Sequence, residues 1–296
     1  MKGSGHSMPQ LTANGISLEY DTFGNPANPA LLLVMGLGAQ MIAWDVRLCQ
    51  LLVDKGFHVI RFDNRDCGLS QSFDGAPFDV AAAMAGDPST APYRLWDMAD
   101  DAAALLTELG IDRAHVVGAS MGGMIVQELL IKHGDRLLSA CSIMSTTGDP
   151  AVGHSTPEAT AALQAPPPQT AAEAGEAAVR ASKVIGSTGI PVDVDTIRAG
   201  GEAAFARARN PLGFVRQLAA IMASGDRTEG LRSVKVPTLV IHGEVDTLLN
   251  VSGGKATAAA IPDSRLLLIP GMGHDLPKAI WPQVVDAIAD NAARAV

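Results

Sequence analysis

The stretch VVGASMGGMIV, residues 116–126, places a single serine between two glycines at the end of an apolar run. Ser120 occupies the third position of the pattern Gly-x-Ser-x-Gly, with Gly118 before it and Gly122 after it. In this pattern a sharp turn from a strand into a helix exposes a serine for nucleophilic attack, and glycines avoid collisions with the neighbouring strand and helix. The same five positions also form purely structural turns, so the motif decides nothing until partners for the serine are found.

Short apolar strands alternate with amphipathic helices on both sides of this stretch. The pattern predicts strands at residues 16–20, 30–36, 58–63, 114–118, 138–144, 236–243 and 264–271. It predicts helices at residues 43–56, 95–109, about 121–133, about 253–260 and around 281–288. Such alternation is typical of an α/β fold with a mostly parallel central sheet and helices on both faces.

The stretch from about residue 148 to residue 230 interrupts this alternation. It is rich in Ala, Gly and Pro, includes APPPQ at 165–169, and contains helical patches but no buried-strand pattern. A connection of this length between two strands carries its own structure or is disordered. We expect a helical lid at 148–230, inserted into a core formed by residues 9–147 and 231–296. A flexible surface excursion is the alternative.

The composition favours one large globular unit. The chain has 296 residues, of which 47% are apolar and 18% are charged, so it can bury a substantial core. Its formal charge is −9 and its Lys and Arg residues form no cluster, which argues against nucleic acid or an anionic membrane as a partner. No apolar run approaches the length of a transmembrane helix. The oligomeric state is left open.

The three cysteines, Cys49, Cys67 and Cys141, are scattered and form no C-x-x-C pair. This usage suits a reducing compartment, so we expect a cytoplasmic protein. Neither the cysteines nor the histidines have the spacing of metal ligands, and we expect no metal and no cofactor. The opening residues, MKGSGHSM, lack the apolar segment of a signal peptide and resemble a cloning remnant.

A serine hydroxyl needs a base to accept its proton, and that base needs an acid to orient it and stabilise its charge. In an open parallel sheet, reactive groups gather where the strands end. LVIHGEVD places Asp246 just past one predicted strand, and LLLIPGMGHD places His274 in a Gly-rich loop past the next. Asp275 is a rival acid, but adjacent loop residues usually point apart. We therefore expect Ser120, His274 and Asp246 to form a catalytic triad.

The order Ser120, Asp246, His274, each in its expected context, makes the chain resemble the α/β-hydrolase fold family over nearly its whole length. RFDNRDCGLS, residues 61–70, resembles the D-x-R-G-x-G-x-S stretch of these enzymes, with Asp66 replacing the first glycine. This spelling, together with VMG in place of an H-G opening, is similar to a bacterial branch that includes aclacinomycin methylesterase. The resemblance implies a serine esterase.

The resemblance also implies where a tetrahedral intermediate would be held. In this family one N–H donor comes from the residue after the serine, here Met121, and the other from the loop after the strand at 30–34. By similarity Leu37 supplies that second donor, and the glycines beside it allow close approach. Many relatives have histidine where this chain has Met35, so one usual loop-fixing side chain is absent.

Other residues near these loops are expected to stabilise the fold or to line a substrate pocket. Asp63 and Arg65 are expected to form an ion pair that braces their loop, rather than to act in catalysis. His242, at a strand end, is expected to be packed or hydrogen-bonded. Met144 and Leu248, which follow predicted strands, are candidate walls of a substrate pocket.

The leading interpretation is a serine hydrolase that cleaves small, apolar carboxylic esters through an acyl-enzyme intermediate. A C–C bond hydrolase, a lactonase or a cofactor-free perhydrolase would use the same triad. Another alternative is a ligand-binding protein that kept the fold and lost catalysis. Haloalkane dehalogenases and epoxide hydrolases are disfavoured, because they use an Asp nucleophile where this chain has Ser120.

Overall fold

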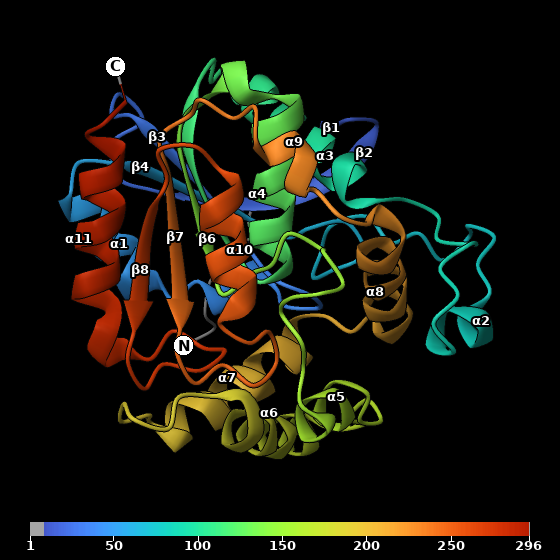
Figure 1. Cartoon of the computed structure of the whole chain (residues 1–296). Helices are drawn as coiled ribbons and strands as arrows, with labels where there is room; N and C mark the ends of the chain where they lie inside the picture. Colours follow the sequence, from blue (N-terminus) through green and yellow to red (C-terminus); the bar gives the residue numbers. More distant parts are fainter. Residues whose placement is uncertain (1–8, 296) are drawn as a thin grey trace, which may run out of the picture.

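An eight-stranded sheet with helices on both faces forms the centre of the protein (Figure 1). A computed structural model describes residues 9–295, so the predicted cloning remnant before Met8 lies outside the described residues. The strands are β1 (Gln10–Ala13), β2 (Ile16–Phe23), β3 (Ala30–Val34), β4 (His58–Phe62), β5 (Ala114–Ala119), β6 (Leu137–Ile143), β7 (Thr238–Gly243) and β8 (Arg265–Ile269).

The strands run in the order β1-β2-β4-β3-β5-β6-β7-β8. All neighbours from β4 to β8 are parallel, whereas β2 pairs antiparallel with both β1 and β4. Every residue of β3 and β5 is buried, which explains why these strands read as continuous apolar runs rather than alternating ones. The predicted α/β fold with a mostly parallel sheet is confirmed. Strand β1 has four residues at the sheet edge, too short for a periodicity to predict it.

The helices that pack on the sheet form two layers. On one face lie α1 (Val46–Asp54) and α11 (Trp281–Ala292), and on the other lie α3 (Leu95–Glu108), α4 (Met121–Lys132) and α10 (Ser252–Ala260) (Figure 1). The remaining helix of this part is α2 (Val80–Met84), and short 3-10 turns cover Met41–Ala43, Gly134–Arg136 and Lys278–Ile280. Each layer buries its own apolar cluster against the sheet, as amphipathic helices do.

Five helices lie between β6 and β7, in the stretch where the sequence interrupts its alternation. They are α5 (Pro157–Leu163), α6 (Ala171–Ile185), α7 (Val194–Arg207), α8 (Pro211–Ser224) and α9 (Thr228–Leu231). The side chain before each of α5, α6, α7 and α8 accepts a hydrogen bond from the first turn, which fixes where these helices begin. The arrowheads of β7 and β8 point toward α5, α6 and α7 (Figure 1). These helices therefore face the end of the sheet where reactive groups gather in parallel folds.

The two ends of this helical segment meet. A Cβ on Gly148 would lie 2.2 Å from the carbonyl oxygen of Gly225, so the chain segments touch there. The Arg227 N–H donates to the carbonyl oxygen of Thr147 at 2.9 Å, and the buried Arg227 guanidinium also donates to the carbonyl oxygen of Thr146 at 3.0 Å. Because its ends are closed in this way, the segment leaves and re-enters the core without disturbing the order of β6 and β7.

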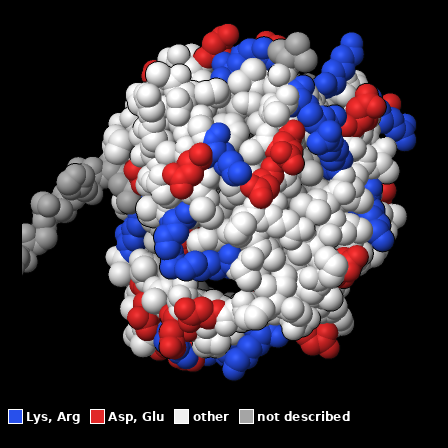
Figure 2. Space-filling model, turned by 90° about the vertical axis from the view of Figure 1, so that its left-hand side faces the viewer, with Lys and Arg blue, Asp and Glu red and all other residues white. Residues whose placement is uncertain are grey.

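The surface carries both signs of charge. On the face drawn in Figure 2, Lys and Arg side chains are interspersed with Asp and Glu, and no extended basic patch covers that face. Within residues 9–295, no helix is both long enough and apolar enough to cross a membrane. Cys49, Cys67 and Cys141 are buried and free, and burial raises the pKa of the Cys49 thiol to about 12.

Candidate active site

Ser120 lies at the turn between β5 and α4, in a conformation that few residues other than glycine adopt. Its φ is 56° and its ψ is −119°. A Cβ on Gly118 would lie 2.1 Å from the carbonyl oxygen of Gly122, and a Cβ on Gly122 would lie 2.1 Å from the carbonyl oxygen of Val34. Both glycines are therefore needed for α4 to begin this close to the sheet, in agreement with the steric argument from the sequence.

The structure brings Ser120, His274 and Asp246 into one hydrogen-bonded row. His274 Nε2 lies 2.9 Å from Ser120 Oγ, and His274 Nδ1 lies 2.7 Å from Asp246 Oδ2. The three residues follow β5, β8 and β7, so they meet at the carboxyl edge of the sheet. The backbone N–H of His274 donates to the carbonyl oxygen of Ile185 at the end of α6, and this bond fixes the histidine loop against the helical segment.

Asp246 is held ionised although it is buried. Its Oδ1 accepts hydrogen bonds from the N–H groups of Leu248 and Leu249, each at 2.9 Å. Burial by itself raises the pKa of this carboxyl, but hydrogen bonds from His242 and His274 and the backbone outweigh it and lower the pKa to about 2. An ionised Asp246 accepts a hydrogen bond from the Nδ1–H of His274, which directs the lone pair of Nε2 toward Ser120.

His242 and Asp275, the two other candidates near the row, have different contacts. His242 is fully buried; its Nε2 lies 2.7 Å from the carbonyl oxygen of Leu249 and 3.5 Å from Asp246 Oδ2. The expectation of a hydrogen-bonded imidazole is met. Asp275 Oδ1 accepts hydrogen bonds from the N–H and the hydroxyl of Ser187, so its carboxylate is turned away from the imidazole. Asp246 is the acid that contacts His274.

The loop after β3 lies against Ser120. A Cβ on Gly36 would lie 3.1 Å from Ser120 Cβ, so only a glycine permits this approach without a shift. Leu37 follows Gly36 and is half-buried, while Met121 is fully buried at the first position of α4. The first N–H groups of a helix have no partner within that helix. The structure therefore places both predicted donor residues beside Ser120; their role in binding an oxyanion stays a prediction.

Comparisons with known proteins identify the family of this chain. A sequence model described as the alpha/beta hydrolase fold matches residues 29–177, half of the chain. The chain belongs to this family. Rhodomycin D methylesterase DnrP of Streptomyces peucetius is 27% identical over 305 residues, which span 96% of this chain and 98% of the relative. The predicted resemblance to a methylesterase branch of the α/β-hydrolases is therefore confirmed.

Further relatives extend the range of ester chemistry among these α/β-hydrolases. The 3-oxoadipate enol-lactonase 2 of Acinetobacter baylyi is 34% identical over 131 residues, 44% of this chain and 42% of the relative. Among solved structures, the enol-lactonase from Burkholderia xenovorans LB400 has a TM-score of 0.75 at 23% identity, over 97% of this chain and 100% of that one. A thermophilic esterase from Thermogutta terrifontis has a TM-score of 0.73 at 24% identity, over 97% and 99%. These two structures establish the likeness of the fold.

The expected ion pair between Asp63 and Arg65 is wrong. Asp63 lies 2.7 Å from Nη1 of Arg207 in α7, and Arg65 Nε donates to Asp101 in α3 at 2.6 Å. The chain turns after β4, and Asp66 has a φ of 65°, so side chains that are close in sequence point to different elements. Both charges are structural, as expected, but they brace the loop against two helices rather than against each other.

Asn64 is a residue that the sequence did not single out. Its Nδ2 donates to the carbonyl oxygen of Met35 at 2.9 Å, so it fixes the loop in which Met35 stands where many α/β-hydrolases have histidine. The signal was present in the quoted stretch RFDNRDCGLS, but the sequence does not show that Asn64 lies opposite Met35. Asn64 thus ties the loop that carries Met35 to the loop after β4.

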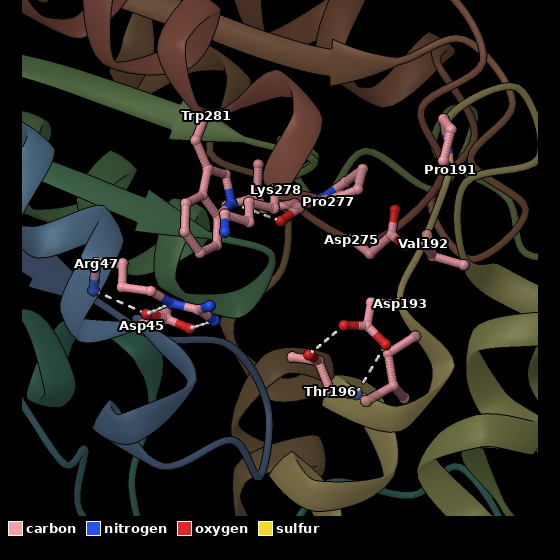
Figure 3. Close-up of a pocket in the computed structure, with 12 residues that line it drawn as sticks. Asp45, Arg47, Pro191, Val192, Asp193, Thr196, Asp275, Pro277, Lys278 and Trp281 are labelled. Atoms are coloured by element: carbon pink, nitrogen blue, oxygen red, sulfur yellow. Dashed lines mark hydrogen bonds and ion pairs between the residues drawn. The ribbon is translucent and has the colours of Figure 1, made fainter.

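A cavity of about 400 Å³ is lined in part by the residues that follow His274, from Asp275 to Lys278. Its lining residues include Asp275 and Trp281 but neither Ser120 nor His274. In Figure 3 the charges of Asp45 and Arg47 pair with each other, and Asp193 accepts a hydrogen bond from the Thr196 hydroxyl. This cavity is distinct from the row of Ser120, His274 and Asp246. Within residues 9–295, no group of three or more His, Cys, Asp or Glu side chains is placed to hold a metal ion.

Proposed function

We propose that the protein is a serine hydrolase that cleaves carboxylic esters through an acyl-enzyme intermediate. One observation carries the proposal: His274 is within hydrogen-bond distance of both Ser120 Oγ, at 2.9 Å, and Asp246 Oδ2, at 2.7 Å. A serine hydroxyl is a weak nucleophile until a base removes its proton, and this geometry supplies that base with its orienting acid.

In the proposed reaction Ser120 Oγ attacks the ester carbonyl while His274 Nε2 accepts the hydroxyl proton. Asp246 stabilises the imidazolium that forms and keeps the proton of Nδ1 in place. When the tetrahedral intermediate collapses, His274 gives its proton to the departing alcohol, and the acyl group stays on Ser120. Water activated by His274 then attacks the acyl carbon, releases the acid and restores the serine.

The N–H groups of Leu37 and Met121 are proposed to hold the negative oxygen of both tetrahedral intermediates. Met121 opens α4, whose N-terminus also favours negative charge. The helical segment at 148–230 is proposed as a lid over this site. Met144 and Leu248, which are both buried and lie next to the β6 and β7 ends, are proposed as walls for a small apolar substrate.

The relatives support ester hydrolysis and also favour a second candidate. A methylesterase aligns with 96% of this chain, which supports a carboxylic ester as substrate. Enol-lactonases occur among both the sequence relatives and the solved structures, and a lactone is a cyclic ester that the same triad can open. A panel of linear esters, methyl esters, lactones, a diketone, and peroxide with acetate separates these substrates from C–C bond cleavage and perhydrolysis.

Replacing Ser120 by alanine tests the proposed function directly. Ser120→Ala is expected to lower kcat for a p-nitrophenyl acyl ester by at least about ten-thousandfold, because a triad without its nucleophile loses most of its catalysis. Ser264→Ala is the matched control, since its hydroxyl bonds only to the carbonyl oxygen of Ala258 at 2.8 Å. Circular dichroism verifies the fold of both variants. Turnover by folded Ser120→Ala close to that of the wild type would overturn the mechanism.

A further inference from the structure

The loop beside Ser120 is a tight turn whose shape depends on one peptide. The Ala39 N–H donates to the carbonyl oxygen of Gly36 at 3.2 Å, and Gly38 has a φ of 65°. This combination matches a type II turn, in which the third residue needs a positive φ. The alternative type I turn differs by a flip of the peptide that joins Leu37 to Gly38. The orientation of the Leu37–Gly38 peptide decides where the Leu37 carbonyl oxygen and the Gly38 N–H point.

A single side chain from the helical segment holds that peptide. Gln217, in α8, is completely buried, and its Oε1 accepts the Gly38 N–H at 2.8 Å. Its Nε2 donates to the carbonyl oxygen of Arg65 at 2.7 Å. Both ends of the amide are therefore used, and they connect the turn at 36–39 to the loop after β4. A flip of the Leu37–Gly38 peptide would break the first bond and leave the Gln217 oxygen buried without a partner.

Helix α8 is itself fixed in place near the turn. Phe214, one helical turn before Gln217, lies so close to Gly38 that a Cβ there would be 2.6 Å from Phe214 Cδ2. Arg216, the residue directly before Gln217, donates to both carboxylate oxygens of the buried Asp66, at 2.7 and 2.8 Å. Gln217 is thus presented by a helix with its own anchors, which a positioning role requires.

We propose that Gln217 is a positioning residue for the oxyanion loop, which rests on the proposed ester hydrolysis at Ser120. Its bond occupies the Gly38 N–H, so that group is not a donor to substrate. The Leu37 N–H, on the preceding Gly36–Leu37 peptide, is then the donor that this turn offers, and the Gln217 bond keeps the turn around it in its type II form before substrate arrives. Preorganised donors act on the transition state more than on the bound ester. Gln217 therefore affects kcat more than KM.

The test replaces Gln217 in two ways and compares each with the same change at Gln127. Gln217→Met keeps the volume but removes both hydrogen bonds, and Gln217→Asn shortens the amide by one methylene. Gln127 is the matched control, because it is also completely buried and uses both amide atoms, toward Thr146 and Arg227. kcat and KM are measured for a p-nitrophenyl ester, together with Ki for a trifluoromethyl ketone, which forms a tetrahedral oxyanion on a reactive serine.

In folded Gln217→Met and Gln217→Asn, kcat is expected to fall by about ten- to a hundredfold, the effect of a small displacement of a catalytic group. KM is expected to change less than kcat, and Ki is expected to rise by the same factor as kcat/KM falls. Both Gln127 variants keep kcat and Ki near wild type. The proposal is overturned if kcat and Ki stay unchanged in the Gln217 variants, or if only KM changes. It is also overturned if the Gln127 variants lose as much activity, or if neither Gln217 variant folds. Failure of the proposed function would give a different result. In that case the wild type would not hydrolyse the ester, or Ser120→Ala would retain activity.

Discussion

At the scale of single residues, two glycines decide whether Ser120 can occupy its turn. A side chain at Gly122 would meet the backbone of β3, which is a central strand and cannot move aside. Gly118 faces the start of α4 in the same way. The Gly-x-Ser-x-Gly spelling is therefore a steric requirement of this strand–helix junction as well as a catalytic signature.

Gly122→Ala is expected to lower the free energy of unfolding by about 3 kcal/mol, because the added methyl group overpacks a rigid junction. Gly200→Ala is the control, since a Cβ there meets nothing within 4 Å and the residue lies inside α7. That change is expected to raise the same free energy by about 0.5 kcal/mol through helix propensity. Urea unfolding measures both values, and equal values for the two variants would contradict the steric account.

The sequence was sufficient to single out Ser120, Asp246 and His274, because each of them lies within a few residues of the end of a recognisable strand. It was not sufficient for Asn64 and Gln217. Asn64 acts through a contact with the loop of another strand, and Gln217 meets a turn that lies 179 residues before it. Neither contact leaves a periodic or local signal, since an amide is also common on exposed helix faces.

At the scale of elements, α7 and α8 are attached to the core by buried ion pairs. Arg207 of α7 meets Asp63 at 2.7 Å, and Arg216 of α8 meets Asp66 at 2.7 Å. Both carboxylates lie in the loop after β4, within the RFDNRDCGLS stretch that resembles the family pattern. The departure of this chain from that pattern, Asp66 in place of glycine, thus provides the buried partner for a helix of the 148–230 segment.

Arg216→Met is expected to lower the free energy of unfolding by about 3 kcal/mol, because it leaves the Asp66 carboxylate buried without its charged partner. Arg232→Met is the control: Arg232 pairs with Glu229 on the surface, where both side chains are largely exposed. That change is expected to cost no more than about 0.5 kcal/mol. Urea unfolding and limited proteolysis of the 148–230 segment measure the difference, and equal sensitivity of the two variants would contradict the account.

Element boundaries show where periodicity succeeds and where it fails. The helix predicted at about 121–133 is α4 (Met121–Lys132), and the strand predicted at 58–63 is β4 (His58–Phe62). The apolar run after Ser120 was enough to predict α4, although no side chain caps its start, and the buried apolar run of β4 was enough to predict that strand. The individual helices of the 148–230 segment could not be delimited, since their buried residues are few and mostly alanine or glycine.

At the scale of the whole molecule, the strand order assembles the site. β5, β7 and β8 carry the three residues of the row, and β6 lies between β5 and β7. Parallel strands place their carboxyl ends at one edge, so Ser120, Asp246 and His274 meet although 126 residues separate the serine from the aspartate in the numbering. The helical segment leaves the core after β6 and returns before β7, and α5, α6 and α7 lie at that edge (Figure 1).

The stability of the molecule in acid is expected to depend in part on Asp246. Its pKa is about 2 in the folded protein, below the ordinary value of 3.8 for an aspartate carboxyl, so ionised Asp246 stabilises the fold above about pH 4. This contribution, about 2 kcal/mol, is lost as the pH falls from 4 to 2. Asp246→Asn should therefore show a smaller loss of stability across that range than the wild type, measured by urea unfolding. Equal losses would contradict the lowered pKa.

The central claim is that Ser120 is a nucleophile activated by His274, and labelling with a fluorophosphonate tests it most directly. Peptide mapping by mass spectrometry is predicted to find one adduct, on the peptide that carries Ser120. The adduct is predicted to be absent in Ser120→Ala and to form far more slowly in His274→Ala. A folded wild-type protein that stays unlabelled, or an adduct on another residue such as Ser145, whose hydroxyl bonds to the Ser120 carbonyl oxygen, would contradict the account.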